Sequence, residues 1–400
     1  MSRIGCRDVP CRAVDAAHSK FTLAYPESAN RVRLPTLFAP FTKHQPEHAR
    51  LKGLSDNPAY QWWREPNLIQ PHSWWARAQD AAILESEAAT MGELGVEVFR
   101  FEVPWRELAP VRPGRDRYDS KAASDPDWSG YRWARLELIL DVLEVESILP
   151  LPVITHPPSW AIGPVTATAA SPPLGSELFG DLMTALASRF RSHVRHWELW
   201  NEPDHPHSWS GSLRDYVRLV LEPGSAAIRA AAPEATILVG GLADYRNLPL
   251  LDAAGGSGLY DVASIHAYPG LPSSRAVARA VRRTRALGKP VWLTECGIAS
   301  RAPSLSSSFG GVTSEEGQAR FVRSLFESVD ADAVFVYQLH DTAIFDASGL
   351  RLKEVFWGMV DESGRRRKPA FDAYRQAPVR RHSRALGSDS RRRRALPAAR

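Results

Sequence analysis

From about residue 76 onward, the sequence alternates between segments with helical periodicity and short apolar segments of the kind that form buried strands. The helical pattern is clear at 78–94, where Leu84, Ala88 and Met91 recur at helical spacing before Gly95. Strands rich in Val, Ile and Leu that alternate with helices are typical of a parallel sheet with a covered outer face. Seven such strands are predicted, at 95–103, 148–155, 193–199, 235–240, 260–266, 291–295 and 333–338.

An eighth strand, predicted at 33–41, completes a series of eight strands that are each followed by a helix. Eight units of this kind favour a closed (β/α)8 barrel, the TIM barrel, over an open doubly wound sheet. The open sheet usually carries a glycine-rich phosphate turn after its first strand, and this sequence has none. We therefore expect a single α/β domain over residues 31–377. Its long loops on the C-terminal, catalytic face are expected at 42–75, 156–175, 299–313 and 340–357.

The two ends of the chain differ in composition from the predicted barrel. Residues 1–30 are expected to be a poorly ordered extension; they lack the apolar segment of a secretory signal, which favours a cytoplasmic location. Residues 378–400 carry eight arginines and one aspartate, while the whole chain has a net charge of only +5. We expect this tail to be disordered and solvated, although RNA, a membrane surface or an acidic polysaccharide would suit its charge. The predicted barrel is slightly acidic, so nucleic acid is not the expected partner, and no apolar run is long enough to span a membrane.

Chemistry in this topology is expected where the strands end, at the C-terminal face. The fourth strand runs into the sequence HWELWNEPD, which places Asn201 and Glu202 at that face, and the seventh ends in VWLTECG, which places Glu295 there. Two strands on opposite sides of a closed barrel can direct their side chains at one point. Glycoside hydrolysis requires such a pair, because one carboxyl group protonates the leaving oxygen and the other attacks or activates water. Taken singly, each glutamate has an alternative role as a salt-bridge partner in a loop.

The segments WELWNEPD and WLTECG resemble the acid/base and nucleophile motifs of the retaining glycoside hydrolases of clan A, the 4/7 superfamily. Within the clan the chain is most similar to family 39, over about residues 90–375. Further segments carry the resemblance: VFRFEVPWRELAP, HPPSWA, SIHAYPG, YQLHD and WGMVDESGRRRKPAFDAY. The resemblance implies that Glu202 is the general acid/base, that Glu295 is the nucleophile, and that the reaction is a double displacement through a covalent glycosyl-enzyme. It implies no cofactor.

Four neighbouring residues are candidates for supporting this pair. Asn201 is placed to hydrogen-bond the sugar 2-hydroxyl, and Arg100, on the second strand, to keep Glu295 ionised. His266 and Tyr268 come from the end of the sixth strand, beside the strand of the nucleophile, and a tyrosine hydroxyl can orient a carboxylate. For Arg100 the alternative is a structural ion pair, and for His266 it is a hydrogen-bonded place in the core.

A second group of residues is expected to line the sugar site. It comprises His156, Gln338 and His340, together with four tryptophans in predicted loops that suit stacking on a sugar face: Trp105, Trp160, Trp209 and Trp357. For each tryptophan, ordinary packing is an equal alternative. The histidine-containing segment 204–207 lacks a third ligand for a metal ion, and no metal site is predicted.

Three functions remain open at this point: a retaining glycosidase, a transglycosylase that uses the same residues, and a carbohydrate-binding barrel without catalysis. A pure binding protein has no use for two converging carboxylates, which favours the glycosidase. Xylosides, glucosides, uronides and longer polysaccharides all fit these motifs, whether the enzyme acts at chain ends or within chains. The sequence gives no indication of the oligomeric state.

Overall fold

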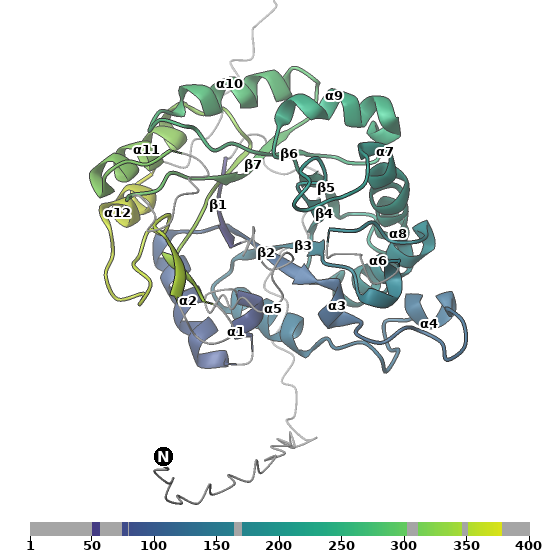
Figure 1. Ribbon diagram of the computed structural model, residues 1–400. Helices are drawn as coiled ribbons and strands as arrows, with labels where there is room; N and C mark the ends of the chain where they lie inside the picture. Colours follow the sequence, from purple (N-terminus) through teal and green to yellow (C-terminus); the bar gives the residue numbers. More distant parts are fainter. Residues whose placement is uncertain are drawn as a thin grey trace, which may run out of the picture. The chain divides into compact units, whose positions relative to one another are not determined.

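Eight parallel strands form one sheet in the computed structural model, in the order β5-β4-β3-β2-β1-β8-β7-β6. Bridges between Leu238 and Val262 and between Leu242 and Ile265 join β5 to β6, so the two ends of the sheet meet. The result is a (β/α)8 barrel with helices around the ring of strands (Figure 1), as predicted. The structure describes residues 50–56, 74–78, 80–163, 170–301, 311–345 and 351–377.

The barrel strands are β1 (Leu51–Asp56), β2 (Val98–Pro104), β3 (Leu149–Thr155), β4 (His196–Asn201), β5 (Thr236–Gly241), β6 (Ala263–His266), β7 (Val291–Cys296) and β8 (Ala333–Val336). Two further strands, β9 (Thr342–Phe345) and β10 (Arg351–Val355), pair antiparallel. The α-helices are α1 (Trp74–Arg77), α2 (Ala81–Leu94), α3 (Trp105–Leu108), α4 (Ser120–Ser124), α5 (Ala134–Val145), α6 (Ser176–Phe190), α7 (Leu213–Tyr216), α8 (Glu222–Ala231), α9 (Leu248–Leu251), α10 (Ser274–Arg285), α11 (Glu315–Ser328) and α12 (Pro369–Arg375).

The first barrel strand differs from the prediction. Segment 33–41 lies outside the described residues, and the strand between β2 and β8 is Leu51–Asp56, inside the region 42–75 that was expected to be a loop. The expected loop 340–357 likewise contains the β9–β10 pair. The other seven strands lie where the apolar segments predicted them, within a few residues.

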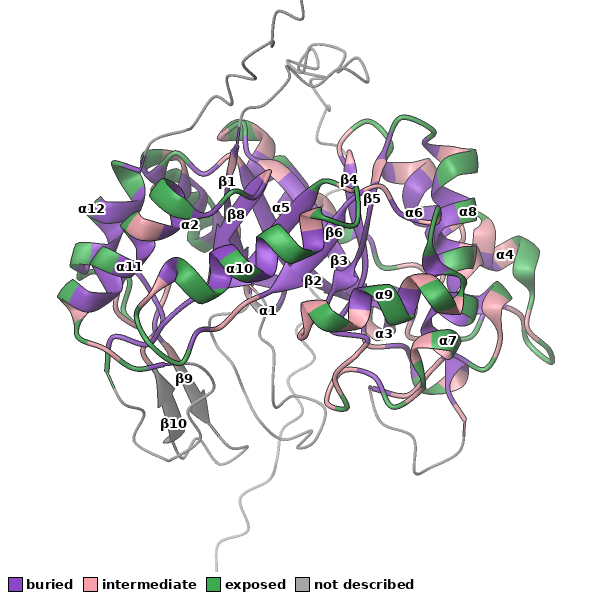
Figure 2. Ribbon diagram, turned by 90° about the horizontal axis from the view of Figure 1, so that it is seen from above, coloured by how far each residue is buried: buried purple, intermediate pink, exposed green. Residues whose placement is uncertain are grey.

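The barrel is filled below its C-terminal mouth by a layer of inward-facing side chains. Val98, Leu151, Leu238, Trp292 and Phe335 belong to one buried cluster contributed by five different strands. A much larger cluster lies between the strands and the surrounding helices, which bury their inner faces and expose their outer ones (Figure 2). The filled lower layer leaves the C-terminal mouth as the place for chemistry.

None of the helices in the described ranges is both long enough and apolar enough to cross a membrane. The expected extension 1–30 and tail 378–400 lie outside the described residues.

Candidate active site

Glu202 and Glu295 reach the barrel mouth from β4 and β7 through two local departures from regular strand structure. At the end of β4, Trp200 and Glu202 adopt positive φ angles of 82° and 45°, a conformation that costs an L-residue about 1–3 kcal/mol and that clusters at functional sites. Along β7, the register with β6 shifts by one residue, so that Leu293 pairs with Ile265 but Glu295 pairs with His266. Such a bulge re-aims a side chain, and here it turns Glu295 into the mouth.

The Arg100 guanidinium lies at the centre of the site, fully buried, and its donors are satisfied by side chains. Nε and Nη2 donate to the two oxygens of Glu198 at 2.6 and 3.1 Å. Nη1 donates to Glu295 at 2.6 Å and to Ser55 at 3.2 Å, and Nη2 also donates to Asn201 Oδ1 at 2.8 Å. The two carboxylates outweigh burial and raise the pKa of Arg100 further, so the group stays cationic.

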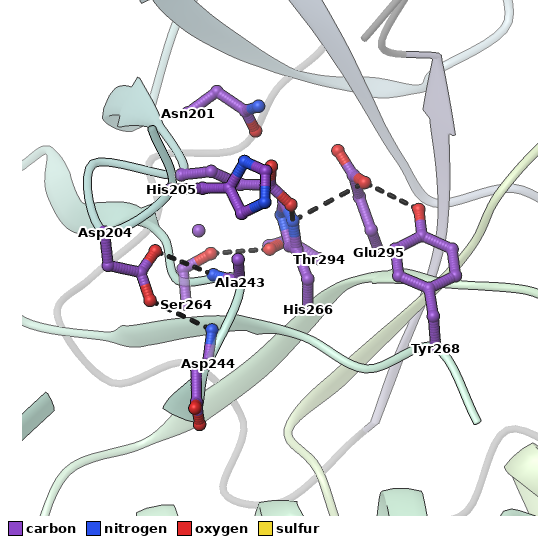
Figure 3. Close-up of polar contacts among 12 residues, drawn as sticks. Asn201, Asp204, His205, Ala243, Asp244, Ser264, His266, Tyr268, Thr294 and Glu295 are labelled. Atoms are coloured by element: carbon purple, nitrogen blue, oxygen red, sulfur yellow. Dashed lines mark hydrogen bonds and ion pairs between the residues drawn. The ribbon is translucent and has the colours of Figure 1, made fainter. Parts of the chain in front are cut away.

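His266 and Tyr268 hold the two glutamates from the side of β6. His266 Nδ1 lies 2.8 Å from Glu202 Oε1. The same atom lies 3.5 Å from Glu295 Oε2, to which the Tyr268 hydroxyl donates at 2.6 Å (Figure 3). Burial by itself lowers the pKa of His266, but the charge of Glu295 and the hydrogen bond to Glu202 outweigh it and raise the pKa. Burial, followed by the charge of Glu295, raises the pKa of Tyr268, which keeps its hydroxyl protonated as a donor.

The two carboxylates, although 93 positions apart in the sequence, are close neighbours in space. One oxygen of Glu202, one of Glu295 and a ring nitrogen of His266 all lie within 4.8 Å of one another, and all three residues are buried. Among the described residues this group has the atom types that would hold a metal ion. The oxygens of Glu295 already accept from Arg100 and Tyr268, so the group is occupied by internal hydrogen bonds.

The loop that follows Glu202 is fixed by Asp204. Its two carboxylate oxygens accept the backbone N–H groups of Ala243 and Asp244 at 2.9 Å each (Figure 3). The Asn247 amide donates to the same carboxylate at 3.0 Å. This carboxylate therefore ties the end of β4 to the segment that follows β5. The histidine-containing segment 204–207 serves as a structural link at this residue.

The remaining predicted residues fall into two groups. His156 bonds to Glu102 at 2.8 Å at the ends of β3 and β2, and Trp357 lies against the Tyr268 ring with centroids 4.8 Å apart, so both lie beside the site. By contrast, His340 faces Glu87 of α2 at 3.0 Å. Gln338 donates its amide to Thr342 at 2.6 Å and its backbone N–H to the carbonyl of Trp357, so it adjoins a residue that lies beside the site.

Packing explains most of the predicted tryptophans. The rings of Trp105 and Trp209 are 1% and 2% exposed within the hydrophobic core, so for these two the packing alternative holds. Trp160 is half-buried, lies edge-on to Trp105, and donates its indole N–H to the Ala109 carbonyl at 2.9 Å.

Three residues of the site were missed by the sequence analysis. Glu198 is fully buried in β4 and pairs with Arg100, and a carboxylate inside a buried strand was itself a signal, because it requires a cation. Glu102 pairs with His156. Position 241 requires glycine, because a Cβ there would lie 2.2 Å from His266 Nε2. No sequence pattern predicts this requirement.

The chain matches a known protein family. The family model described as Cellulase (glycosyl hydrolase family 5) matches residues 63–316. No curated protein matches the sequence.

Among solved structures, the chain is similar to a family 39 glycoside hydrolase from Bacteroides cellulosilyticus, at 17% identity and a TM-score of 0.52, over 82% of this chain and 63% of that one. A monomeric β-xylosidase from Caulobacter crescentus matches at 18% identity and a TM-score of 0.57, over 82% and 69% of the two chains. A family 1 β-glucosidase from Thermotoga maritima matches at 14% and 0.52, over 81% and 96%. At these identities the likeness shows the fold, and this chain spans less than two thirds of the Bacteroides enzyme.

Proposed function

The chain belongs to the cellulase family, glycosyl hydrolase family 5, and is a glycosidase; from this premise we propose that it cleaves its carbohydrate substrate with retention of anomeric configuration. In this proposal Glu295 is the nucleophile and Glu202 is the general acid/base. The family model and the family 39 enzymes among the structural neighbours both bear out the predicted clan A resemblance.

The separation of the two carboxylates carries the proposal. Inverting glycosidases hold their carboxyl groups about 6.5–9.5 Å apart to leave room for a water molecule, whereas retaining enzymes hold them about 5–5.5 Å apart. One oxygen of Glu202 and one of Glu295 lie within 4.8 Å of each other, a closer approach than the gap an inverting enzyme keeps open for water. This spacing supports direct attack by a carboxylate on the anomeric carbon.

In the first step, a Glu295 oxygen forms a bond to the anomeric carbon while the glycosidic C–O bond breaks. Glu202 gives its proton to the departing oxygen, so the leaving group departs as a neutral alcohol. Arg100 and Tyr268 hold Glu295 in position for attack. Because Arg100 also donates to Asn201 Oδ1, the amide nitrogen of Asn201 is left to donate to the sugar 2-hydroxyl.

In the second step, Glu202 removes a proton from water, and the water oxygen displaces Glu295 from the anomeric carbon. Glu295 is uncharged while it is esterified to the sugar, which removes the negative charge that faces Glu202 during the first step. His266 Nδ1, at 2.8 Å from Glu202, orients that carboxyl group in both steps. The products are the alcohol and a sugar whose anomeric configuration matches that of the substrate.

The Glu295→Ala variant tests the nucleophile. It should lose turnover, and azide should restore cleavage of an activated aryl glycoside by forming a glycosyl azide of inverted configuration. The matched control is Glu85→Ala, an exposed glutamate on α2, which should retain full activity. A Glu295→Ala enzyme as active as the parent, or an azide product of retained configuration, would refute the assignment.

The Glu202→Ala variant tests the acid/base. It should spare the first step for aryl glycosides with good leaving groups, which need no protonation, and it should slow alkyl glycosides strongly. Azide should accelerate it to give a glycosyl azide of retained configuration. Equal losses on activated and unactivated substrates would contradict the proposed role.

A further inference from the structure

A further carboxylate, that of Glu102, faces the barrel mouth beside the proposed catalytic pair. Glu102 lies two residues beyond Arg100 on β2, and alternate residues of a strand share one face. Since Arg100 points into the barrel to meet Glu198 and Glu295, Glu102 faces the same interior. It stands about 7 Å nearer the C-terminal mouth, at about 3.3 Å of rise per residue.

Among the described residues, the contacts of the Glu102 carboxylate fall on one of its two oxygens. Oε1 accepts from the Thr155 hydroxyl at 2.7 Å and lies 2.8 Å from His156 Nε2. Among the residues that the structure describes, no hydrogen bond reaches the second oxygen, Oε2. The side chain keeps 9% of its surface exposed. Oε2 is not among the fully buried side-chain atoms that lack a partner, so it is accessible to a hydroxyl group that enters the mouth.

The carboxylate is ionised and acts on the same tyrosine, Tyr337, as the proposed catalytic pair. Burial raises the pKa of Glu102, but the charge of His156 and the hydrogen bonds from His156 and Thr155 outweigh it and lower the pKa overall. Burial also raises the pKa of Tyr337, and the charges of Glu295, Glu202 and Glu102 contribute to the same shift. Tyr337 lies edge-on to Tyr268, which donates to Glu295. Arg106 also lowers the pKa of Glu102. Glu102 therefore brings a third carboxyl group to the mouth beside those of Glu202 and Glu295, partly balanced by His156 and Arg106.

We propose that Glu102 determines sugar specificity: its Oε2 accepts a hydrogen bond from a hydroxyl of a neutral sugar, and its charge repels uronates. This inference rests on the proposed function and narrows the substrate class of the same site. Neutral glycosides supply hydroxyl donors, while a uronate would bring a fourth carboxylate towards Glu102, Glu202 and Glu295. Thr155 and His156 bond to Oε1 of Glu102 and so fix the orientation of the whole carboxylate, including Oε2, which would accept the hydrogen bond from the sugar.

The test compares Glu102→Gln with the parent enzyme on three substrates: the neutral aryl glycoside that it cleaves fastest, the corresponding aryl uronide, and a series of mono-deoxy analogues modified away from the 2-position. Glutamine keeps an oxygen for Thr155 and His156 but replaces Oε2 by an NH2 group without charge. We expect kcat/KM for the neutral glycoside to fall about 10-fold, because hydrogen bonds to charged groups are the stronger ones. The ratio of uronide to neutral activity should rise by about 10-fold or more as the repulsion is removed.

The matched control is Glu107→Gln, the same change on α3, where the carboxylate accepts from Trp75 and Arg135. The control should keep the parent's activity ratios. The deoxy series keeps the proposal falsifiable if Glu102→Gln does not fold: in the parent enzyme, one analogue must lose about 10- to 100-fold in kcat/KM, the worth of a hydrogen bond to a charged group. That analogue should suffer a clearly smaller loss in Glu102→Gln.

Parent-like activity of Glu102→Gln on the neutral glycoside, an unchanged uronide ratio, or a deoxy series without a sensitive position would each overturn the proposal. So would equal losses in the Glu107→Gln control, because the effect would then not be specific to Glu102. A parent enzyme that cleaves no glycoside at all would instead refute the proposed function, so the two failures are distinguishable.

Discussion

Gly241, at the end of β5, gives the most demanding prediction about how the site is assembled. A Cβ at this position would lie 2.2 Å from His266 Nε2, 2.8 Å from His266 Cδ2 and 2.9 Å from Glu198 Oε1. Ordinary contact begins near 3.4 Å, so the imidazole and the new methyl group must separate by roughly 1.2 Å more. Neither neighbour can give way freely, because His266 bonds to Glu202 at 2.8 Å and Glu198 bonds to Arg100 at 2.6 Å.

Gly241→Ala should therefore disturb the acid/base through His266. A displacement of 1 Å in the group that orients Glu202 costs about 100-fold in rate, and overpacking costs about 1–3 kcal/mol of stability. The measurement is kcat/KM for an activated and an unactivated aryl glycoside, together with the free energy of unfolding in urea. Since the damage reaches the acid/base first, the unactivated substrate should lose more.

Gly270→Ala is the matched control, because a Cβ at Gly270 meets nothing within 4 Å. It should preserve both activity and stability. If Gly241→Ala retained the parent's kcat/KM on both substrates, the idea that Gly241 makes room for His266 would be refuted. Equal losses on the two substrates would point to general unfolding of the site, and the unfolding curve would show it.

Two further predictions concern buried charge. Glu198→Gln should lower the free energy of unfolding by about 3 kcal/mol, because it breaks the buried pair with Arg100; an unchanged urea midpoint would contradict this. Burial lowers the pKa of His196 from 6.5 to about 4. As the pH falls, His196 is therefore protonated in the unfolded chain before it is protonated in the folded one. The free energy of unfolding that this neutral histidine contributes above pH 6.5 is lost as the pH falls towards 4. The loss amounts to about 3 kcal/mol, and His196→Phe, which keeps a ring against Trp292, should flatten this part of the pH profile in urea unfolding.

The sequence predicted the barrel because seven of its strands carry a strong apolar signal, and it failed at β1 for a physical reason. In β1 the side chain that would fill the barrel is absent: a Cβ at Gly53 would lie 2.4 Å from atoms of the Phe335 ring. The bulk at this level comes from β8, so β1 needs no Val or Ile there. Lys52 and Ser55 are polar residues that interrupt the apolar pattern of the strand. Lys52 donates to the Leu94 carbonyl, and Ser55 accepts a hydrogen bond from Arg100. Because the Phe335 side chain of β8 packs where β1 has a glycine, the sequence of β1 lacks the apolar pattern that predicts a buried strand.

In the site, too, some residues could be predicted from the sequence pattern, whereas the positions of others depend on tertiary packing. Asn201, Glu202 and Glu295 were found because strand ends gather at one face of a parallel barrel, whatever the details of each strand. Glu198 was missed because attention to strand ends overlooks the strand interior, where its pairing with Arg100 is set. Residues such as His340 and Trp209 have suitable chemistry, yet they contact α2 and the hydrophobic core.

The β7 bulge explains why the position of a strand end was a sounder guide than strand periodicity. Trp292 faces the barrel interior, and so does Thr294, whose hydroxyl lies 2.6 Å from that of Ser264, itself a donor to Glu198. Strict alternation would then direct Glu295 outwards, away from Arg100. The one-residue register shift against β6 reverses this, and Glu295 meets Arg100 at 2.6 Å. A periodicity argument applied to this strand would have rejected the proposed nucleophile, because the departure from regular geometry at the mouth is what brings its carboxylate into the site.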